Sequence, residues 1–391
     1  MPPTPVTPYT PPTFGPRTQD QTGTYTISSR DSLTANGNSL TANGNSLTAN
    51  GNTATISGSD LHRSMSSRTS RRRERLVRCL AKDDIDMAEL TQISWQGIPA
   101  DLRPIVWQLL LTYLPLPSAQ RLNKLHVKRQ EYASLSSLTF SKPLEQTIWH
   151  QIAIDVPRTR PGVPLWADPA TQKCLERILY LWAVRHPASG YVQGINDLVT
   201  PFFQVFLSFY IDGDPSIFSP SNLPQSALTA VEADSFWCLS NLLDGIQMNY
   251  IHGQPGIVNA LSKMSELVGR IDYKLSQHLE KEGVEYMQFA FRWMNCLLMR
   301  ELSVENTIRM WDTYMCEGSQ AFSQFHLFVC TAFLLTWSKQ LLEMDFQGMI
   351  MFLQSLPTQD WSDRNIEELM GKAWQLSNTW KDAQGHLGTP R

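Results

Sequence analysis

The hydrophobic positions follow a helical period along most of the chain. From Leu76 onward, apolar residues recur every three or four positions, whereas the strict alternation typical of β-strands is scarce. Each apolar stripe gives a helix one face that must be buried against other helices. We therefore predict an all-α fold, with a single large domain of a dozen or more helices over residues 75–382. The clearest segments are 257–281, 284–300, 304–315, 322–340, 344–356 and 362–380.

Two runs are almost entirely apolar, residues 199–211 and 325–337. Both are shorter than the roughly 18 residues that a helix needs to cross a bilayer. We expect both to be buried core helices, and we predict no transmembrane segment.

The first 70 residues are rich in Pro, Thr, Ser, Gly and Asn, and they contain tandem copies of Ser-Leu-Thr-Ala-Asn-Gly-Asn that start at Ser32, Ser39 and Ser46. One leucine per copy provides no coiled-coil seam, and Gly and Asn disfavour a helix. We predict a disordered tail over residues 1–70 and a flexible C-terminus over residues 383–391.

A basic run ends this tail. It either solvates the first helix, which we favour, or contacts anionic lipid head groups or a nucleic acid. The formal net charge of −3 gives no overall bias toward either polyanion, so we predict no nucleic-acid partner and leave a peripheral membrane contact open. The run consists of Arg68, Arg71, Arg72, Arg73, Arg75 and Arg78.

The composition suits a large reduced core. The chain is 42% hydrophobic and has 12 tryptophans, enough for an extensive packed interior. The 6 cysteines are scattered, mostly in apolar stretches, as expected for the buried thiols of a cytosolic protein rather than for a disulfide scaffold.

Several catalytic and cofactor-binding motifs are missing. A P-loop needs Gly-x4-Gly-Lys-Ser/Thr, and the only Gly-Lys pair, Gly371-Lys372, lacks the rest. The sequence has no Gly-x-Ser-x-Gly elbow, no His-Glu-x-x-His and no cysteines or histidines at zinc-ligand spacing. We therefore predict no metal site and no cofactor of its own, and leave uncertain whether the chain is an enzyme in its own right.

A helix-start signal follows the first apolar residues of the globular part. In Gly97-Ile98-Pro99, the proline suits a first helical turn. Arg103 and Trp107 lie four residues apart, so they share one helix face, and we expect them to be structural.

A loop over residues 188–194 separates two apolar stripes. His186-Pro187 ends the stripe that contains Trp182, and a new stripe begins at Ile195. A helix that begins near Asn196 or Asp197, with one of them as its cap, places Gln193 on the loop just before it. Residues 212–230 are expected to form a surface excursion.

Two short signatures carry the candidate chemistry. Arg158 ends Ile152-x2-Asp155-x2-Arg158, and Gln193 lies within Tyr191-x-Gln193-Gly194-x-Asn196-Asp197. A planar guanidinium and a neutral amide are what a protein offers to complete phosphoryl transfer in the nucleotide site of another protein. Because the chain shows no nucleotide site of its own, this pair indicates two catalytic fingers.

With these motifs the chain resembles the TBC-domain family of GTPase-activating proteins for Rab GTPases. The Ile98-Pro99-x3-Arg103-x3-Trp107 opening and the two finger signatures occur in the order of the family. Trp293, and the pair Trp311-Asp312, resemble later segments of the family pattern. The string 185–203 resembles the Golgi-associated subgroup.

Many members of the family carry Cys and Met where this chain has Val192 and Ile195. Neither side chain does chemistry, so this departure leaves the implied activity intact.

The resemblance implies a division of labour with a GTP-bound Rab partner, which brings GTP and Mg²⁺. Arg158 would stabilise charge in the transition state and Gln193 would position the attacking water. Asp155 is expected to hold the Arg158 guanidinium through a charge-assisted bond. The remaining supporting residues are Ile152, Tyr191, Gly194, Asn196 and Asp197.

The resemblance further implies a role in vesicle trafficking and a cytoplasmic location, peripheral at Golgi or other endomembranes. An alternative hypothesis stays open: a noncatalytic scaffold that binds Rab proteins or membranes and retains the family motifs.

Overall fold

The computed structural model describes residues 67–318 and 320–380, with side chains from Thr69 onward. Within these residues the secondary structure is helical, and only one isolated β-bridge, between Asp84 and Pro117, occurs. The predicted all-α fold is confirmed. The predicted tail, apart from its last residues, and the predicted flexible C-terminus lie outside the described residues, and the domain bounds stay predictions.

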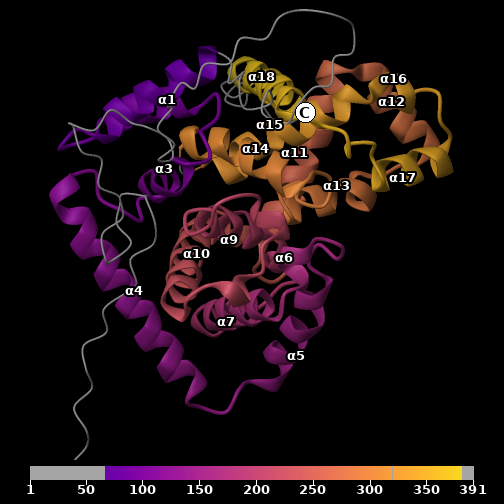
Figure 1. The fold of residues 1–391 in the computed structure, drawn as a ribbon. Helices are drawn as coiled ribbons and strands as arrows, with labels where there is room; N and C mark the ends of the chain where they lie inside the picture. Colours follow the sequence, from indigo (N-terminus) through magenta and orange to yellow (C-terminus); the bar gives the residue numbers. More distant parts are fainter. Residues whose placement is uncertain (1–66, 319, 381–391) are drawn as a thin grey trace, which may run out of the picture.

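The helices form two groups, and the chain passes from the first group to the second and back again (Figure 1). The upper group in this view combines the first helices with the last ones. Its members are α1 (Ser67–Leu80), α2 (Met87–Ser94), α3 (Arg103–Leu110), α11 (Pro255–Ile271), α12 (Tyr273–Glu282), α13 (Tyr286–Asn295), α14 (Val304–Cys316), the π-helical η6 (Ala321–Phe325), α15 (His326–Thr336), α16 (Ser338–Leu341), α17 (Phe346–Gln354) and α18 (Asp363–Trp380).

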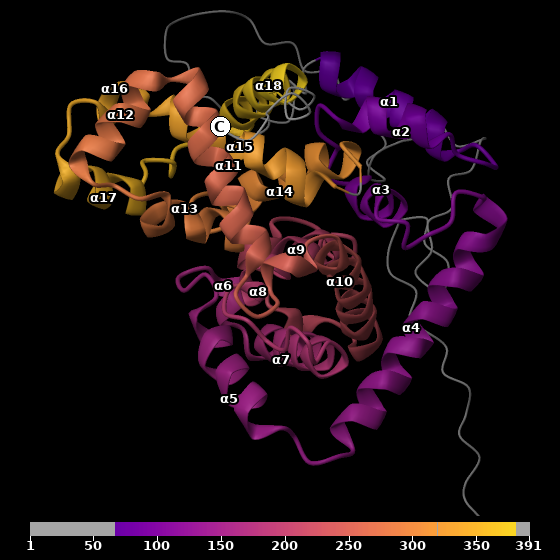
Figure 2. The same cartoon turned by 180° about the vertical axis from the view of Figure 1, so that it is seen from behind.

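The lower group contains the middle of the chain, with the long α4 running down one edge in both views (Figure 2). Its members are α4 (Ser118–Phe140), α5 (Gln146–Asp155), α6 (Pro164–Ala167), α7 (Pro169–Arg185), α8 (Ile195–Leu198), α9 (Thr200–Leu207) and α10 (Gln225–Gly245). Short 3-10 turns complete it: η2 (Val156–Arg158), η3 (Pro215–Ile217), η4 (Pro220–Asn222) and η5 (Gln247–Asn249).

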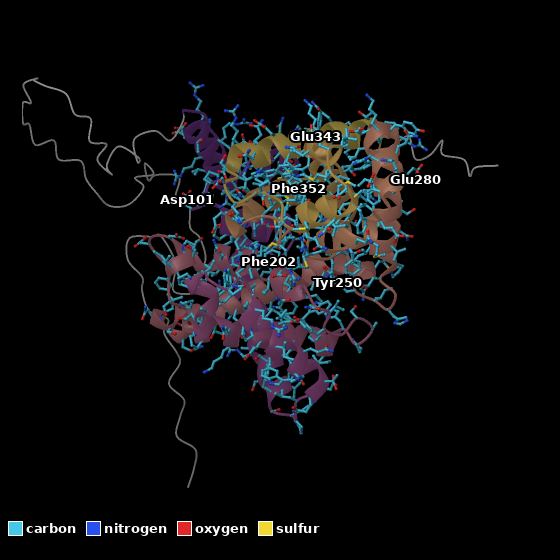
Figure 3. All side chains as sticks on the ribbon, turned by 90° about the vertical axis from the view of Figure 1, so that its right-hand side faces the viewer. Asp101, Phe202, Tyr250, Glu280, Glu343 and Phe352 are labelled. Carbon is cyan, nitrogen blue, oxygen red and sulfur yellow. The ribbon has the colours of Figure 1, made fainter. Side chains whose placement is uncertain are left out.

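An aromatic cluster joins the two groups. Phe202 on α9 lies 5.7 Å from Trp107 on α3 and 5.3 Å from Trp311 on α14, measured between ring centroids. Phe202 and Tyr250 lie at mid-height in the molecule, between the upper and lower helices (Figure 3). Aromatic pairs at these separations add packing energy beyond their buried area. The cluster therefore fixes how α9, which follows the Gln193 loop, sits against the upper group.

Asp312 on α14 collects the residues of the opening motif. Its carboxylate accepts hydrogen bonds from the Ile98 amide at 2.9 Å, from Arg103 Nε at 3.0 Å and from Trp107 Nε1 at 2.8 Å. The Asp312 side chain is 0% exposed, so its charge is compensated by these donors alone. A motif predicted to be structural is thus tied to a residue far along the chain.

Two acidic residues on α10, separated by one residue, hold the long helix α4 in place. Asp234 accepts from Arg129 Nη2 at 2.7 Å and from Tyr113 at 2.8 Å. Glu232 accepts from Tyr132 on α4 and from Arg177 Nε on α7, the latter at 2.7 Å. Because both carboxylates are buried, these charge-assisted bonds fix the order in which α4, α10 and α7 pack.

Several predicted helix bounds are wrong. The expected helix 257–281 is broken at Asp272, whose carboxylate caps α12 by accepting from the Leu275 amide at 3.0 Å. The expected helix 284–300 ends at Asn295, and 322–340 divides into η6, α15 and α16. The surface excursion 212–230 is too long, since α10 begins at Gln225. Hydrophobic periodicity continues across a break because the residues on both sides still face the core.

Helices α1 and α3 also begin elsewhere than expected. The helix expected at Pro99 begins at Arg103, after a turn in which the Pro99 carbonyl accepts from the Leu102 amide. Helix α1 begins at Ser67, well before the first apolar stripe. Arg72 donates to the Gln96 carbonyl at 2.7 Å, and Arg73 pairs with Asp101 at 2.7 Å. Two arginines of the basic run therefore bind the protein itself.

The apolar runs and most of the cysteines are buried, as predicted. The runs 199–211 and 325–337 form α9 and α15, whose residues are largely buried. All six cysteines are free thiols, and only Cys316 is partly exposed. In the described part of the chain, no helix is both long and apolar enough to span a bilayer.

The buried His326 predicts a pH dependence of stability. Its Nε2 donates to the Trp293 carbonyl at 3.0 Å and its Nδ1 accepts from the Tyr314 hydroxyl at 2.7 Å, so the ring is held neutral. Burial lowers the pKa of His326 to about 4. The unfolded chain takes up this proton near its ordinary pKa of about 6.5, so the histidine's contribution is present at pH 7 and is lost as the pH falls toward 4.

We expect this histidine to lower the free energy of unfolding by about 2 kcal/mol when the pH falls from 7 to 5. The difference in unfolding free energy between the wild type and His326→Gln should shrink by about this amount. Urea unfolding at both pH values measures it. An unchanged difference between the two pH values would contradict the prediction.

Candidate functional site

Arg158 is presented at the end of a short turn. Helix α5 ends at Asp155, and Pro157 converts the chain into the 3-10 turn η2, whose last residue is Arg158. Ile152 and Val156 are 0% exposed and anchor this segment in the core. The Arg158 side chain is exposed and makes no hydrogen bond or ion pair to any residue that the structure describes. Its guanidinium is thus free to bind a partner.

Gln193 is presented on the loop between α7 and α8, as predicted. Its side chain is exposed, while its backbone carbonyl accepts from Asn295 Nδ2 at 2.9 Å. Gly194 has a φ of +106°, and a Cβ there would lie 2.7 Å from Asn295 Nδ2 and 2.9 Å from Cys296 Sγ. The position therefore requires glycine both for its backbone conformation and for its close approach to α13.

The helix after this loop begins differently from the prediction. Helix α8 begins at Ile195 with Gly194 at its N-cap, so neither Asn196 nor Asp197 caps it. The Asn196 side chain instead accepts from the Gly194 amide at 3.1 Å, and Asp197 accepts from Arg300 Nε at 2.9 Å. Both residues support the loop through tertiary contacts.

A buried polar network joins the two loops. The Tyr191 hydroxyl donates to Asp155 Oδ2 at 2.9 Å, and Asn196 Nδ2 donates to Thr159 Oγ1 at 2.9 Å. Burial, and then Asp155, raise the pKa of Tyr191, so its hydroxyl keeps the donated proton at neutral pH. Two exposed side chains, Arg158 and Gln193, therefore extend from one connected base.

The expected contact between Asp155 and Arg158 is absent from the described residues. Asp155 is only 8% exposed and turns inward to Tyr191, whereas the Arg158 side chain points to solvent. The role of Asp155 therefore differs from the predicted one. It links the two loops instead of holding the guanidinium.

Further arginines surround the two loops. Arg160 has a φ of +48° and donates to the Met299 carbonyl, and burial lowers the pKa of its guanidinium. Arg300 neutralises Asp197. The exposed Arg158 guanidinium has no carboxylate partner among the described residues, so it favours an anionic group such as a phosphate.

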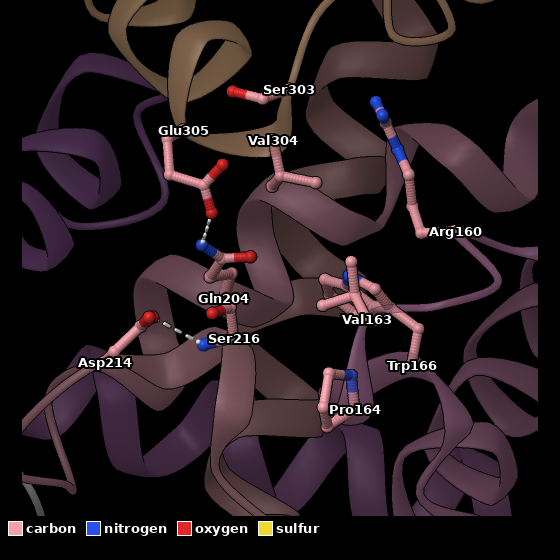
Figure 4. Close-up of a pocket in the computed structure, with 10 residues that line it drawn as sticks. All are labelled: Arg160, Val163, Pro164, Trp166, Gln204, Asp214, Ser216, Ser303, Val304 and Glu305. Carbon is pink, nitrogen blue, oxygen red and sulfur yellow. Dashed lines mark hydrogen bonds between the residues drawn. The ribbon is translucent and has the colours of Figure 1, made fainter. Parts of the chain in front are cut away.

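A pocket of about 530 Å³ adjoins Arg160 (Figure 4). Residues of α6, α9, η3 and the start of α14 line it. Across it, Gln204 Nε2 donates to Glu305 Oε1 at 3.0 Å. Among the residues that the structure describes, no cluster of His, Cys, Asp or Glu could hold a metal ion.

Sequence reasoning missed several residues of this site. Thr159, Arg160, Asn295 and Arg300 belong to no predicted site, although each contacts one of the two loops or a neighbour of the fingers. Asn295 is 102 residues from Gln193 in the sequence, so no local motif joins them. The one available signal was the helix predicted over 284–300, whose true end falls at Asn295.

Comparisons with known proteins show the family of the chain. The Rab-GTPase-TBC domain family matches residues 100–342. The GTPase-activating protein gyp1 of Schizosaccharomyces pombe is 53% identical over 320 residues, which cover 80% of this chain and 62% of that protein. Human TBC1 domain family member 22B is 49% identical over 326 residues, which cover 82% of this chain and 64% of that protein. The chain thus spans less than two thirds of the length of these relatives.

Solved structures show the same fold. The Ypt/Rab-GAP domain of Gyp1p has a TM-score of 0.77 at 50% identity, covering 80% of this chain and 99% of that one. The TBC domain of a Chlamydomonas flagellar RabGAP has a TM-score of 0.58 at 20% identity, covering 81% of this chain and 95% of that one, a likeness of fold alone. Matched over most of its helical domain by sequence and by structure, the chain belongs to the Rab-GTPase-TBC domain family.

Proposed function

We propose that this chain is a GTPase-activating protein for a Rab-family GTPase in its GTP-bound state. The observation that carries the proposal is the pair of exposed side chains, Arg158 and Gln193, which extend from a shared buried network. The similarity to proteins named as GTPase-activating supports it.

Each side chain has a separate task in this proposal. Arg158 donates to the phosphoryl oxygens as charge develops in the transition state, and Gln193 aligns the attacking water, since its amide both donates and accepts. GTP and Mg²⁺ belong to the partner, and the chain uses no cofactor of its own. The charge of Arg158, unpaired among the described residues, favours approach to the phosphates.

Single-turnover phosphate release from a panel of GTP-loaded Rabs tests the proposal. The full chain is used because α1 begins at Ser67 and packs against α2, so a truncation near residue 75 would cut a docked helix. Acceleration by the wild type that Arg158→Ala abolishes would support the activity. Binding to a Rab with hydrolysis at the intrinsic rate would instead favour the noncatalytic scaffold.

Replacing Gln193 should lower the stimulated rate of GTP hydrolysis nearly as much as replacing Arg158. We expect Gln193→Ala to lower the stimulated rate about 10²- to 10³-fold, the usual loss when one preorganised polar contact to the transition state is removed. Gln193→Glu should be at least as damaging, because it places a negative charge beside phosphate. Stopped-flow phosphate release measures both variants. Gln120→Ala, at another exposed glutamine, on α4, should keep the wild-type rate.

We also propose a peripheral location at Golgi or other endomembranes, supported by the resemblance of residues 185–203 to the Golgi-associated subgroup. Exposed Arg71, Arg75 and Arg78 on α1 are available for contact with anionic lipid head groups. Imaging of the tagged chain beside a Golgi marker tests the location, and a diffuse signal throughout the cell would count against it.

A further inference from the structure

The segment between α13 and α14 has an unusual backbone. Helix α13 ends at Asn295, and Leu297 and Leu298 follow with φ angles of +49° and +59°. Leucine rarely adopts this left-handed conformation, which costs on the order of 1–3 kcal/mol per residue. Both leucines are 0% exposed, so the surrounding core holds them in it. Such strain persists where the rest of the fold requires the local geometry.

This segment contacts both finger loops. Asn295 Nδ2 donates to the Gln193 carbonyl at 2.9 Å, and the Met299 carbonyl accepts from Arg160, two residues after Arg158. Arg300 pairs with Asp197 at 2.9 Å, just beyond the Gln193 loop.

The two left-handed leucines make the contact of the Met299 carbonyl possible. In an uninterrupted α-helix the Met299 carbonyl would accept from the amide four residues later, so it would not be available to Arg160. The amide of Leu298 bonds to the Trp293 carbonyl, and that of Met299 bonds to the Cys296 carbonyl, a pattern that differs from the α-helical one. The broken helix thus turns one carbonyl toward the Arg158 loop.

Asn295 is itself fixed in orientation. Its Oδ1 accepts from Gln254 Nε2 at 3.4 Å, and its backbone carbonyl accepts from the Tyr250 hydroxyl at 2.8 Å. Its Nδ2 packs so closely against Gly194 that a Cβ on residue 194 would lie only 2.7 Å from it. The amide therefore has one acceptable orientation, with its donor toward Gln193.

We propose that residues 295–300 form a brace that sets the position of Gln193 relative to Arg158, with Asn295 as the positioning residue for the glutamine. The brace does not touch the nucleotide. It acts through the backbone of the Gln193 loop and through Arg160. Its effect on hydrolysis rests on the proposed GTPase-activating function, whereas its effect on loop order does not.

The decisive variant is Asn295→Asp in the full chain. It keeps the size of the side chain but replaces the donor to the Gln193 carbonyl with a repelling oxygen. Since displacements of about 1 Å cost on the order of 10²-fold, we expect the maximal stimulated rate to fall about 10- to 100-fold. The half-saturating Rab concentration should change by less than about 3-fold, because the contact orients a transition-state group rather than binding Rab.

A matched control lies elsewhere in the core. Asn306 Nδ2 also donates to a backbone carbonyl, that of Trp361, at 2.9 Å, and it is 5% exposed against 6% for Asn295. Asn306→Asp should lower the melting temperature as Asn295→Asp does, yet keep the wild-type maximal rate when both are measured well below their unfolding transitions. Equal rate losses in the two variants would overturn the brace.

Hydrogen exchange separates the brace from the proposed activity. The amides of Gly194 and Ile195 are bonded within the loop and should exchange faster in Asn295→Asp than in Asn306→Asp. Faster exchange in a chain that activates no Rab would support the brace and reject the proposed function. Unchanged exchange would overturn the brace, whatever the activity.

A second variant covers the case in which Asn295→Asp fails to fold. Arg160→Gln removes the guanidinium that reaches the Met299 carbonyl, because the glutamine side chain is shorter, and it should raise exchange at the Thr159 amide and lower the stimulated rate. Its control is Arg121→Gln, since Arg121 likewise donates to backbone carbonyls, at Pro115 and Leu116, but lies on α4. Equal exchange at Thr159 in these two variants would also overturn the brace.

Discussion

Replacing Arg158 by lysine should lower GTPase stimulation about 10³-fold or more, close to the loss expected for alanine. Lysine retains the positive charge but not the planar fork of donors that spreads over the phosphoryl oxygens. A large loss in this conservative variant would assign the effect to geometry as well as charge. Single-turnover phosphate release with saturating GTPase-activating chain measures it.

The Arg158 variants should fold like the wild type. The side chain is exposed and has no partner among the described residues, so its removal costs no packing and no bond. Melting temperatures of wild type and variant should therefore agree. Arg185→Lys, at an exposed arginine that ends α7, serves as the matched control and should keep full stimulation. Wild-type stimulation by Arg158→Lys would contradict the proposed role.

Removing the carboxylate of Asp312 should have the largest effect on stability. Asp312→Ala leaves the Arg103 guanidinium, the Trp107 indole and the Ile98 amide without their acceptor in a buried setting. Breaking a buried charge pair in this way costs about 3–5 kcal/mol, a large part of the stability of a typical domain. Urea unfolding, followed by tryptophan fluorescence, measures the change in unfolding free energy.

Two comparisons make this prediction specific. Asp312→Asn keeps the size and one acceptor oxygen but not the charge, so it should fall between wild type and alanine. Asp101→Ala breaks the pair with Arg73, in which the Asp101 side chain is 48% exposed, and should cost only about 0–1 kcal/mol. Equal losses for Asp101→Ala and Asp312→Ala would show that the buried cluster does not hold α3 against α14.

Helices were predictable from the sequence, but their ends were less so. The stripes that form α14 and α18 were placed within a residue, because each has a continuous apolar face. The segments 257–281 and 284–300 were each taken as a single helix. In both, the interruption depends on roles that residues take only in the folded chain: Asp272 caps a helix, and Leu297 with Leu298 adopts the left-handed conformation.

In the candidate site, too, some features were predictable from the sequence and others were not. Arg158, Gln193 and Gly194 were identified because a finger and its flanking residues lie within one short stretch of chain. Asp155 was given the wrong contact, since proximity in sequence to Arg158 suggested a bond that the fold gives to Tyr191.

By itself, the sequence determined the helical class, the buried apolar runs and the loop that presents Gln193. These features depend on patterns within about 20 residues, where helical period and turn chemistry act. Only the tertiary structure decided which residues support them. Asp312 meets Arg103 across 209 positions and Asn295 meets Gln193 across 102, and such contacts arise when buried polar groups find partners as the helices pack.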